Sequence, residues 1–345
     1  MQLRTKVIFG NFIEELKKLN LEGRGLLCCR RGFKNGLEWL DLKTIRISPE
    51  PTLEDAERYW SNIEGESFDY VLAIGGGSVL DMAKVLAARM TNRGPIESFI
   101  GIERIHNPPK PLIEVPTTHG TGSEVTKYAV LRLTARGVKK SMVSEKICPK
   151  VAIVDPRLAL GLPKELTIYT SIDAFCHNVE AYLTPLADPL VDLVCESGLR
   201  FFFDGIEEAI ENKLEGREKL MLCSLLGGIA ITNVQTTLIH ALSHVLGGRY
   251  EIPHGMANSL FLRGFLEFYR GDEKFERLQR ELGMNVMEEL DAFYERHSLK
   301  RLSDFISERE AIEVAEKAFE NRRLMEGGRR RPSEEDLKKI ALTSF

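Results

Sequence analysis

The sequence predicts an α/β N-terminal domain followed by an all-α C-terminal domain. Two observations lead to this fold class. Strand and helix patterns alternate over the first 160 residues, with a glycine-rich turn after the buried strand that ends at Ile74. After Asp155-Pro156 the spacing of apolar residues becomes almost wholly helical. We therefore expect an α/β domain over residues 1–160 and a helical domain over residues 161–345.

Composition sets the outer bounds on function. The chain of 345 residues is 43% hydrophobic and 28% charged, as expected of an ordinary globular protein. A formal net charge of -4 gives no electrostatic reason to expect a nucleic acid or an anionic membrane as partner. Six scattered cysteines without a CxxC pair favour a reduced, cytoplasmic setting. The apolar stretch 222–248 is interrupted by polar residues, which is typical of a buried helix rather than a membrane span.

The first half of the chain contains a candidate phosphate site. Residues 24–29 and 70–74 read as buried strands, and residues 53–62 read as a helix introduced by Pro51-Thr52. The second strand runs into Gly75-Gly-Gly-Ser78, and residues 79–89 have helical spacing. Glycine turns also serve ordinary tight turns. At the carboxyl end of a strand and the start of a helix, however, bare N–H groups favour binding of a phosphate or pyrophosphate.

A second polar loop follows another strand. Residues 112–115 are predicted to form a strand that leads into residues 116–126, PTTHGTGSEVT. Such a stretch also suits a solvated loop, but its hydroxyls and glycines at a strand end suit a loop that wraps a polar ligand. A β-rich stretch at 127–133 and a strand at 151–155 complete this half.

The second half is predicted to be helical. The expected helices cover residues 171–183, 189–203, 205–212 and 215–244. Ser333 is expected to cap a last helix whose first turn is acidic.

Three of the seven histidines lie within fifteen residues. His240 and His244 are four apart, so on a helix they share one face. Gly247-Gly248 is expected to end this helix, and a short connection through Pro253 brings His254 back.

A second fragment repeats the i, i+4 spacing with Asp173 and His177. Together the two fragments offer one oxygen and three nitrogens, a donor set that suits a divalent transition metal. A single histidine on such a helix is more often a core or capping residue. Because two fragments of this form are present, a metal site and a core or capping role are equal alternatives.

Four motifs resemble one family. They are GGGSVLDMAK (75–84), PTTHGTGSEVT (116–126), DAFCHNVEAY (173–182) and HALSH with PHGMAN (240–258), and they occur in order between about residues 70 and 260. Together they resemble the iron-containing, or group III, alcohol dehydrogenases. The resemblance implies a dinucleotide-binding α/β domain, a helical domain (dehydroquinate synthase-like architecture) and a site in the cleft between them.

The resemblance also implies roles for individual residues. The metal ligands would be Asp173, His177, His240 and His254, with His244 near the metal but not bound to it. The residues around the cofactor phosphates would be Gly76, Gly77, Ser78, Thr117, Thr118 and Thr121, with Asp81 and Lys139 close by.

The chain departs from the family pattern in places that bear on the substrate. The segment before His240 reads TNVQTTLI, where relatives usually have smaller residues, and Arg263-Gly follows PHGMANSLFL in place of the usual proline. The C-terminal domain is also short for the family. These differences leave the four donors intact but give no basis for carrying over a relative's substrate.

The expected function is a metal-dependent, NAD(P)-linked oxidoreductase that interconverts a small alcohol and its aldehyde or ketone by hydride transfer. His244 is a candidate for passing the alcohol proton to solvent, and packing is the equal alternative. Lys127, Tyr128 and Gln235 lie in segments expected to face the cleft, which favours a substrate with a polar group. A homo-oligomer such as a dimer is compatible with the sequence.

The expected metal is Fe²⁺, with Zn²⁺ as the alternative. The expected cofactor is NADP rather than NAD. The strand 26–29 is followed by Arg30 and Arg31 with no carboxylate. An acidic residue there would favour the free 2′-hydroxyl of NAD, whereas guanidinium groups suit the 2′-phosphate of NADP. The alternative is that both arginines point into solvent.

Two other functions remain open. One is a zinc enzyme of the glycerol dehydrogenase or dehydroquinate synthase type, which differs at PTTHGTGSEVT. The other is a nicotinamide-binding protein without redox chemistry, against which the four retained metal donors argue.

Overall fold

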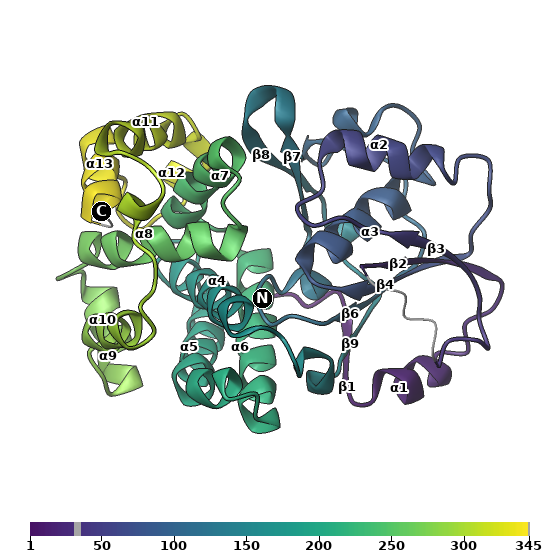
Figure 1. The fold of residues 1–345 in the computed structure, drawn as a ribbon, viewed down its shortest axis with the longest axis horizontal. Helices are drawn as coiled ribbons and strands as arrows, with labels where there is room; N and C mark the ends of the chain where they lie inside the picture. The colour runs from purple at the N-terminus through teal and green to yellow at the C-terminus, as the bar shows by residue number, and fades with distance from the viewer. Residues whose placement is uncertain (31–35, 344–345) are drawn as a thin grey trace.

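The computed structural model describes residues 1–30 and 36–343. The predicted cofactor residue Arg31 lies outside this part of the chain. Figure 1 shows a half that contains a parallel sheet beside a half that is built of helices. The predicted combination of an α/β half and a helical half is therefore confirmed.

All six strands of the main sheet are parallel, in the order β1-β9-β6-β4-β2-β3. Their bounds are Lys6–Phe9 (β1), Arg24–Cys29 (β2), Asp41–Arg46 (β3), Tyr70–Gly75 (β4), Leu112–Pro116 (β6) and Val151–Val154 (β9). Parallel strands end at the same edge of a sheet. Gly75 pairs with Pro116 across β4 and β6, so the glycine turn and the threonine-rich loop begin side by side.

Three helices cover this sheet: α1 (Phe12–Lys18), α2 (Leu53–Ser61) and α3 (Gly77–Arg89). Thr52 starts α2 with a capping box to Asp55, in which each residue satisfies a backbone N–H of the other. Helix α3 begins directly after β4, with the buried strand, the glycine turn and the helix in the predicted order.

A small second sheet contains β5 (Gly101–Ile102), β7 (Tyr128–Leu133) and β8 (Val138–Val143), of which β7 and β8 form an antiparallel hairpin. In Figure 1 this hairpin stands between the sheet half and α7. The sequence analysis missed β8, as it missed the edge strands β1 and β3. Strand β1 has no fully buried residue and β3 has one, so neither shows the continuous apolar run of a central strand.

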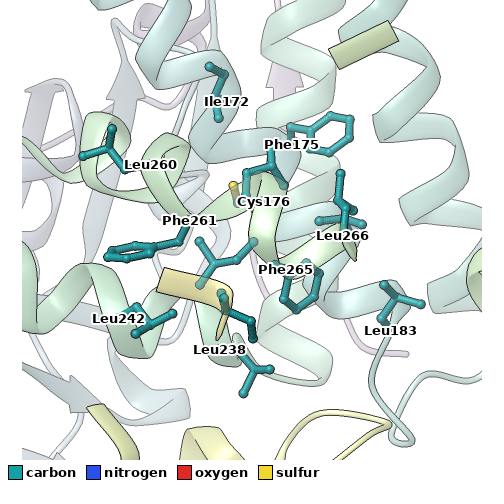
Figure 2. Close-up of a cluster of buried hydrophobic side chains, with 14 of the residues drawn as sticks. Ile172, Phe175, Cys176, Leu183, Leu238, Leu242, Leu260, Phe261, Phe265 and Leu266 are labelled. Atoms are coloured by element: carbon teal, nitrogen blue, oxygen red, sulfur yellow. The ribbon is translucent and has the colours of Figure 1, made fainter. Parts of the chain in front are cut away.

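The second half consists of helices. They are α4 (Lys164–Tyr182), α5 (Pro189–Ile210), α6 (Leu214–Asn233), α7 (Leu238–Tyr250), α8 (His254–Phe268), α9 (Glu273–Leu282), α10 (Val286–Arg296), α11 (Glu308–Phe319), α12 (Arg322–Glu326) and α13 (Glu334–Thr343). Ser333 caps α13 as predicted, since its Oγ accepts from the Asp336 N–H at 3.1 Å. Figure 2 shows the apolar core, in which Phe175 and Cys176 of α4 lie close to Phe261 and Phe265 of α8.

Several helix boundaries differ from the prediction, and α4 begins at Lys164 rather than at Ser171. Helix α5 is continuous through Gly205, where a side chain would meet the Cβ of Lys219 at 2.6 Å, so this glycine lets α6 pack closely. The predicted helix 215–244 is two helices with a bend of 103° between them. Helix α7 passes through Gly247 and Gly248 to Tyr250, because these glycines lie against other backbone; a side chain at Gly248 would meet the Val138 Cα at 2.6 Å.

Within the described residues, no single helix is long and apolar enough to cross a membrane. Only the bent pair of α6 and α7, taken together, meets the length and composition of a span.

Candidate active site

The histidine cluster is built by three helices that meet beside the sheet half. Asp173 and His177 lie on one face of α4, one turn apart. His240 and His244 lie in the same relation on α7, and His254 is the first residue of α8. The structure thus brings all five predicted residues together.

The ring nitrogens converge on one carboxylate oxygen. The Nε2 atoms of His177 and His240 lie 3.7 Å from Oδ1 of Asp173, and Nε2 of His254 lies 3.6 Å from it. These separations are longer than hydrogen bonds. Donors held about 2.0–2.2 Å from a tetrahedral ion lie ~3.4 Å from one another, so the arrangement suits a metal better than direct contact. Donor atoms of Asp173, His240 and His254 all lie within 4.8 Å of each other.

Burial keeps two of these rings neutral. Desolvation lowers the pKa of His177 and of His254 to about 4, in spite of the opposing charge of Asp173. At neutral pH both rings therefore carry a free nitrogen lone pair, which is the form that binds a metal.

His240 has a different environment because of Glu180, which the sequence analysis missed. Nδ1 of His240 contacts Oε2 of this fully buried carboxylate. Burial alone lowers the pKa of His240, but Glu180 and Asp173 together raise it to about 9. Nδ1–H donates to Glu180, so when the ring gives up a proton it is Nε2, facing Asp173, that becomes free, and Glu180 sets the tautomer of the neutral ring. The signal was present in the sequence, since Asp173, His177 and Glu180 follow one helix face.

Asn258 is a second residue that the sequence analysis missed. Its Nδ2 donates to Oδ1 of Asp173 at 2.6 Å and lies 3.4 Å from Nε2 of both His240 and His254. The side chain is fully buried and comes from α8, one turn after His254. It fixes the orientation of the carboxylate that the three rings face.

The cleft between the two halves is lined by residues from the cluster and from the cofactor loops. Of the predicted cofactor residues, those that line it are Gly77, Ser78, Asp81, Thr121 and Lys139. Gly76, Thr117 and Thr118 lie at the same edge of the sheet but not among the lining residues. Arg30 is exposed directly after β2 and does not line the cleft.

Two of the predicted cofactor residues that line the cleft interact with other side chains or backbone groups of the protein. Asp81 accepts from the Ser123 hydroxyl at 2.6 Å and from the Val130 N–H at 2.8 Å, so it joins α3 to the threonine-rich loop and to β7. Lys139 forms an ion pair with Glu50, a cleft residue that the sequence analysis also missed.

His244 faces the cleft beside the cluster. Its ring centroid lies 6.1 Å from that of His240 and 5.6 Å from that of His254. Desolvation, together with the positive charges nearby, lowers the pKa of His244 well below its usual range. Of the three residues expected to border the substrate, Tyr128 lines the cleft, whereas Lys127 and Gln235 do not.

A parallel sheet with phosphate-type loops thus faces a helical half that carries an Asp–His cluster able to hold a metal ion. Residues 6–156 match the family described as iron-containing alcohol dehydrogenase, and residues 167–344 match its C-terminal family. The chain belongs to the iron-containing alcohol dehydrogenase family. Membership in this family implies a metal and a nicotinamide cofactor.

Individual relatives agree with this assignment. The chain is 34% identical to a 1,3-propanediol dehydrogenase of Klebsiella pneumoniae over 244 residues, which are 70% of this chain and 63% of that enzyme. It is 34% identical over 245 residues to a NAD-dependent methanol dehydrogenase of Bacillus methanolicus, over 70% of this chain and 64% of the relative. With an alcohol dehydrogenase of Thermococcus barophilus it shares 32% identity over 87% of this chain and 83% of that one. The match thus spans less than two thirds of the length of the first two relatives.

The solved structures cover the whole fold. A crystal structure of 1,3-propanediol oxidoreductase superposes with a TM-score of 0.91 at 28% identity, over 99% of this chain and 98% of that chain. An alcohol dehydrogenase from Oenococcus oeni gives a TM-score of 0.90 at 28% identity, over 99% of both chains.

Proposed function

We propose that this protein is a metal-dependent, NAD(P)-linked oxidoreductase that interconverts a small alcohol and its aldehyde or ketone. One observation supports this function above all. The three histidines of the Asp–His cluster and the glycine turn line the same cleft, so a substrate held at the cluster and a nicotinamide ring can meet there.

Four residues hold the metal in this proposal: Asp173, His177, His240 and His254. One carboxylate and three imidazoles suit Fe²⁺, and Zn²⁺ is the alternative because zinc competes well for nitrogen donors. A divalent ion in such a site supplies Lewis acidity to the alcohol or carbonyl oxygen.

The chain's own residues orient the reactants and move the proton. Glu180 and Asn258 hold His240 and Asp173, which fixes the donors before substrate arrives. His244 stands beside His240 and His254 at the cleft wall, and we assign it the transfer of the alcohol proton toward solvent. A packing role for His244 is the alternative.

The cofactor phosphates are proposed to lie at the carboxyl edge of the sheet. The residues assigned to them are Gly76, Gly77, Ser78, Thr117, Thr118 and Thr121, with Asp81 and Lys139 close by. Arg30 lies exposed directly after β2, where an acidic residue would favour NAD. A guanidinium at this position supports NADP over NAD. Arg31 has the same proposed role. The Bacillus methanolicus relative is named as NAD-dependent, so this preference would distinguish the present chain.

We also propose a domain boundary near residue 160, a homo-oligomer such as a dimer, and a cytoplasmic location. The change from the last sheet strand, β9, to α4 supports the boundary.

A steady-state assay tests the function. Protein prepared without oxygen and loaded with Fe²⁺ or Zn²⁺ is offered short alcohols with NAD⁺ or NADP⁺, and short aldehydes with the reduced cofactors. We expect turnover that a chelator abolishes and that added metal restores. If the loaded protein binds a nicotinamide cofactor but turns over none of these compounds, it is a nicotinamide-binding protein without this chemistry.

A further inference from the structure

Arg323 brings a positive charge into the cleft from the helical half. It lies on the short helix α12 (Arg322–Glu326) and lines the cleft together with Tyr128, Ile231 and Thr236. His177, His240, His244 and His254 line the same cleft.

The other cations of the cleft already have carboxylate partners. Arg132 donates to Glu251 at 2.6 Å, and Lys139 pairs with Glu50. Arg323 differs, because over residues 1–30 and 36–343 it forms no ion pair. Its Nη1 donates to the neutral Oε1 of Gln235 at 3.4 Å, and the guanidinium also interacts with the uncharged Tyr128 hydroxyl.

Arg323 is partly buried at the cleft wall, where a guanidinium without an anion is available to a negatively charged ligand. The neighbours of Arg323 do not supply it. Ile231 is apolar, and the Tyr128 hydroxyl donates to the Ile231 carbonyl at 3.2 Å. The amide nitrogen of Gln235 donates to the Arg323 carbonyl at 3.2 Å, which holds the backbone of α12 in place without supplying a negative charge.

The cofactor phosphates do not account for this charge. The glycine turn and the threonine-rich loop, whose backbone N–H groups suit phosphates, lie at the carboxyl edge of the sheet. Arg323 instead comes from α12, a helix that packs on α7, which is the helix of His240 and His244. The anion that it faces therefore belongs to the molecule that reaches the Asp–His cluster.

We propose that the substrate carries a carboxylate and that Arg323 binds it, so that the protein acts on a short hydroxy acid and the matching oxo acid. This inference rests on the proposed oxidoreductase function. The reaction itself is unchanged: the alcohol carbon gives a hydride to the nicotinamide, its oxygen gives up a proton, and the carbonyl compound remains. Arg323 determines specificity, since its planar fork matches a carboxylate with two parallel hydrogen bonds.

The test compares 4-oxobutanoate with butanal, which has the same chain length without the charge. The wild-type protein is expected to have the higher kcat/KM for the oxo acid. In Arg323→Ala the ratio of the two kcat/KM values falls about 10–100-fold, mainly through KM for the oxo acid, since charge-assisted hydrogen bonds are lost. Arg323→Lys restores part of the ratio, because it keeps the charge without the fork. Arg322→Ala is the matched control, because Arg322 is the exposed neighbour on the same helix.

A second measurement separates this inference from the proposed function. Titration calorimetry with butanoate on the metal-free protein is expected to show binding by the wild type and by Arg322→Ala but not by Arg323→Ala. If no alcohol or aldehyde is turned over while this pattern holds, the function is wrong and the carboxylate site stands. An equal kcat/KM for oxo acid and aldehyde, butanoate binding that ignores Arg323, or a wild-type preference for the sulfonate of equal length would overturn the carboxylate assignment.

Discussion

One oxygen of Glu180 contacts Nδ1 of His240, and the other oxygen accepts the backbone N–H groups of Thr237 and Ile239 at 3.1 and 2.8 Å. A single buried carboxylate on α4 therefore accepts the N–H groups at the start of α7 and also orients a proposed metal ligand. Backbone donors at the start of a helix need such an acceptor, and a ring nitrogen that donates to a carboxylate is fixed in one tautomer.

The first prediction is that Glu180→Gln weakens metal binding. The amide group presents a donor to Nδ1 of His240, which favours the tautomer whose Nε2 is protonated and closed to a metal. We expect metal affinity to fall about 10–100-fold, measured by competition with a chelator of known affinity. Glu165→Gln, at an exposed position of the same helix, should leave the affinity as it is. Equal affinities for wild type and Glu180→Gln would contradict the role of this contact.

A second prediction concerns pH. Burial raises the pKa of Glu124, in the threonine-rich loop, from its ordinary value of 4.5 to about 7. Between these values the unfolded chain loses its proton first, so the free energy of unfolding falls as the pH rises, and the loss is complete above pH 7. Below pH 4.5 both states are protonated and the group has no effect.

Glu124→Gln should remove this pH dependence. Relative to the wild type, the variant gains up to about 3 kcal/mol of unfolding free energy between pH 4.5 and pH 8, measured by urea denaturation. Other titrating groups are common to both proteins and cancel in the difference. If the free energy of unfolding of the two proteins changed with pH in the same way, the pKa of Glu124 would not be raised in the folded state.

The third prediction addresses the cofactor. If Arg30 binds the 2′-phosphate, the wild type has a higher kcat/KM for NADPH than for NADH, and Arg30→Asp lowers that ratio about tenfold or more. Arg93→Asp is a control with the same change of charge at an exposed position beyond the far end of α3. A preference for NADH that survives Arg30→Asp would mean that this loop does not read the adenine ribose.

Local patterns in the sequence were enough to predict the central strands and the phosphate-type turn. The strand 24–29 agrees with β2 at both ends, and the strand 70–74 falls one residue short of β4. Both are buried along their length, and glycines or charged residues flank them, so the pattern needs no information from distant residues.

The break between α6 and α7 could not be predicted in the same way. The segment Val234–Thr237 contains neither proline nor glycine, and its apolar spacing continues a helix. The new helix starts where Glu180, 57 residues before Thr237, accepts the N–H groups of Thr237 and Ile239. An acceptor so distant in sequence leaves no local signal.

Two predicted helix boundaries at glycines were wrong for a related reason. Gly205 was expected to begin a separate helix and Gly247 to end one, yet both lie inside continuous helices. Their role is close packing, against Lys219 and against the Ile252 carbonyl respectively. A single sequence does not distinguish a glycine that permits a turn from one that admits a neighbouring chain. The site residues Glu50 and Asn258 were missed because their importance comes from contacts with residues far along the chain.

The most direct test of the whole account is the metal content of protein purified without oxygen, measured by elemental analysis for the wild type and for His254→Ala. We expect about one divalent ion per chain in the wild type, and loss of most of the metal and of alcohol oxidation in the variant. His106→Ala, which removes an exposed histidine, should keep both. A His254→Ala protein that retains full metal and full activity would contradict the site proposed here.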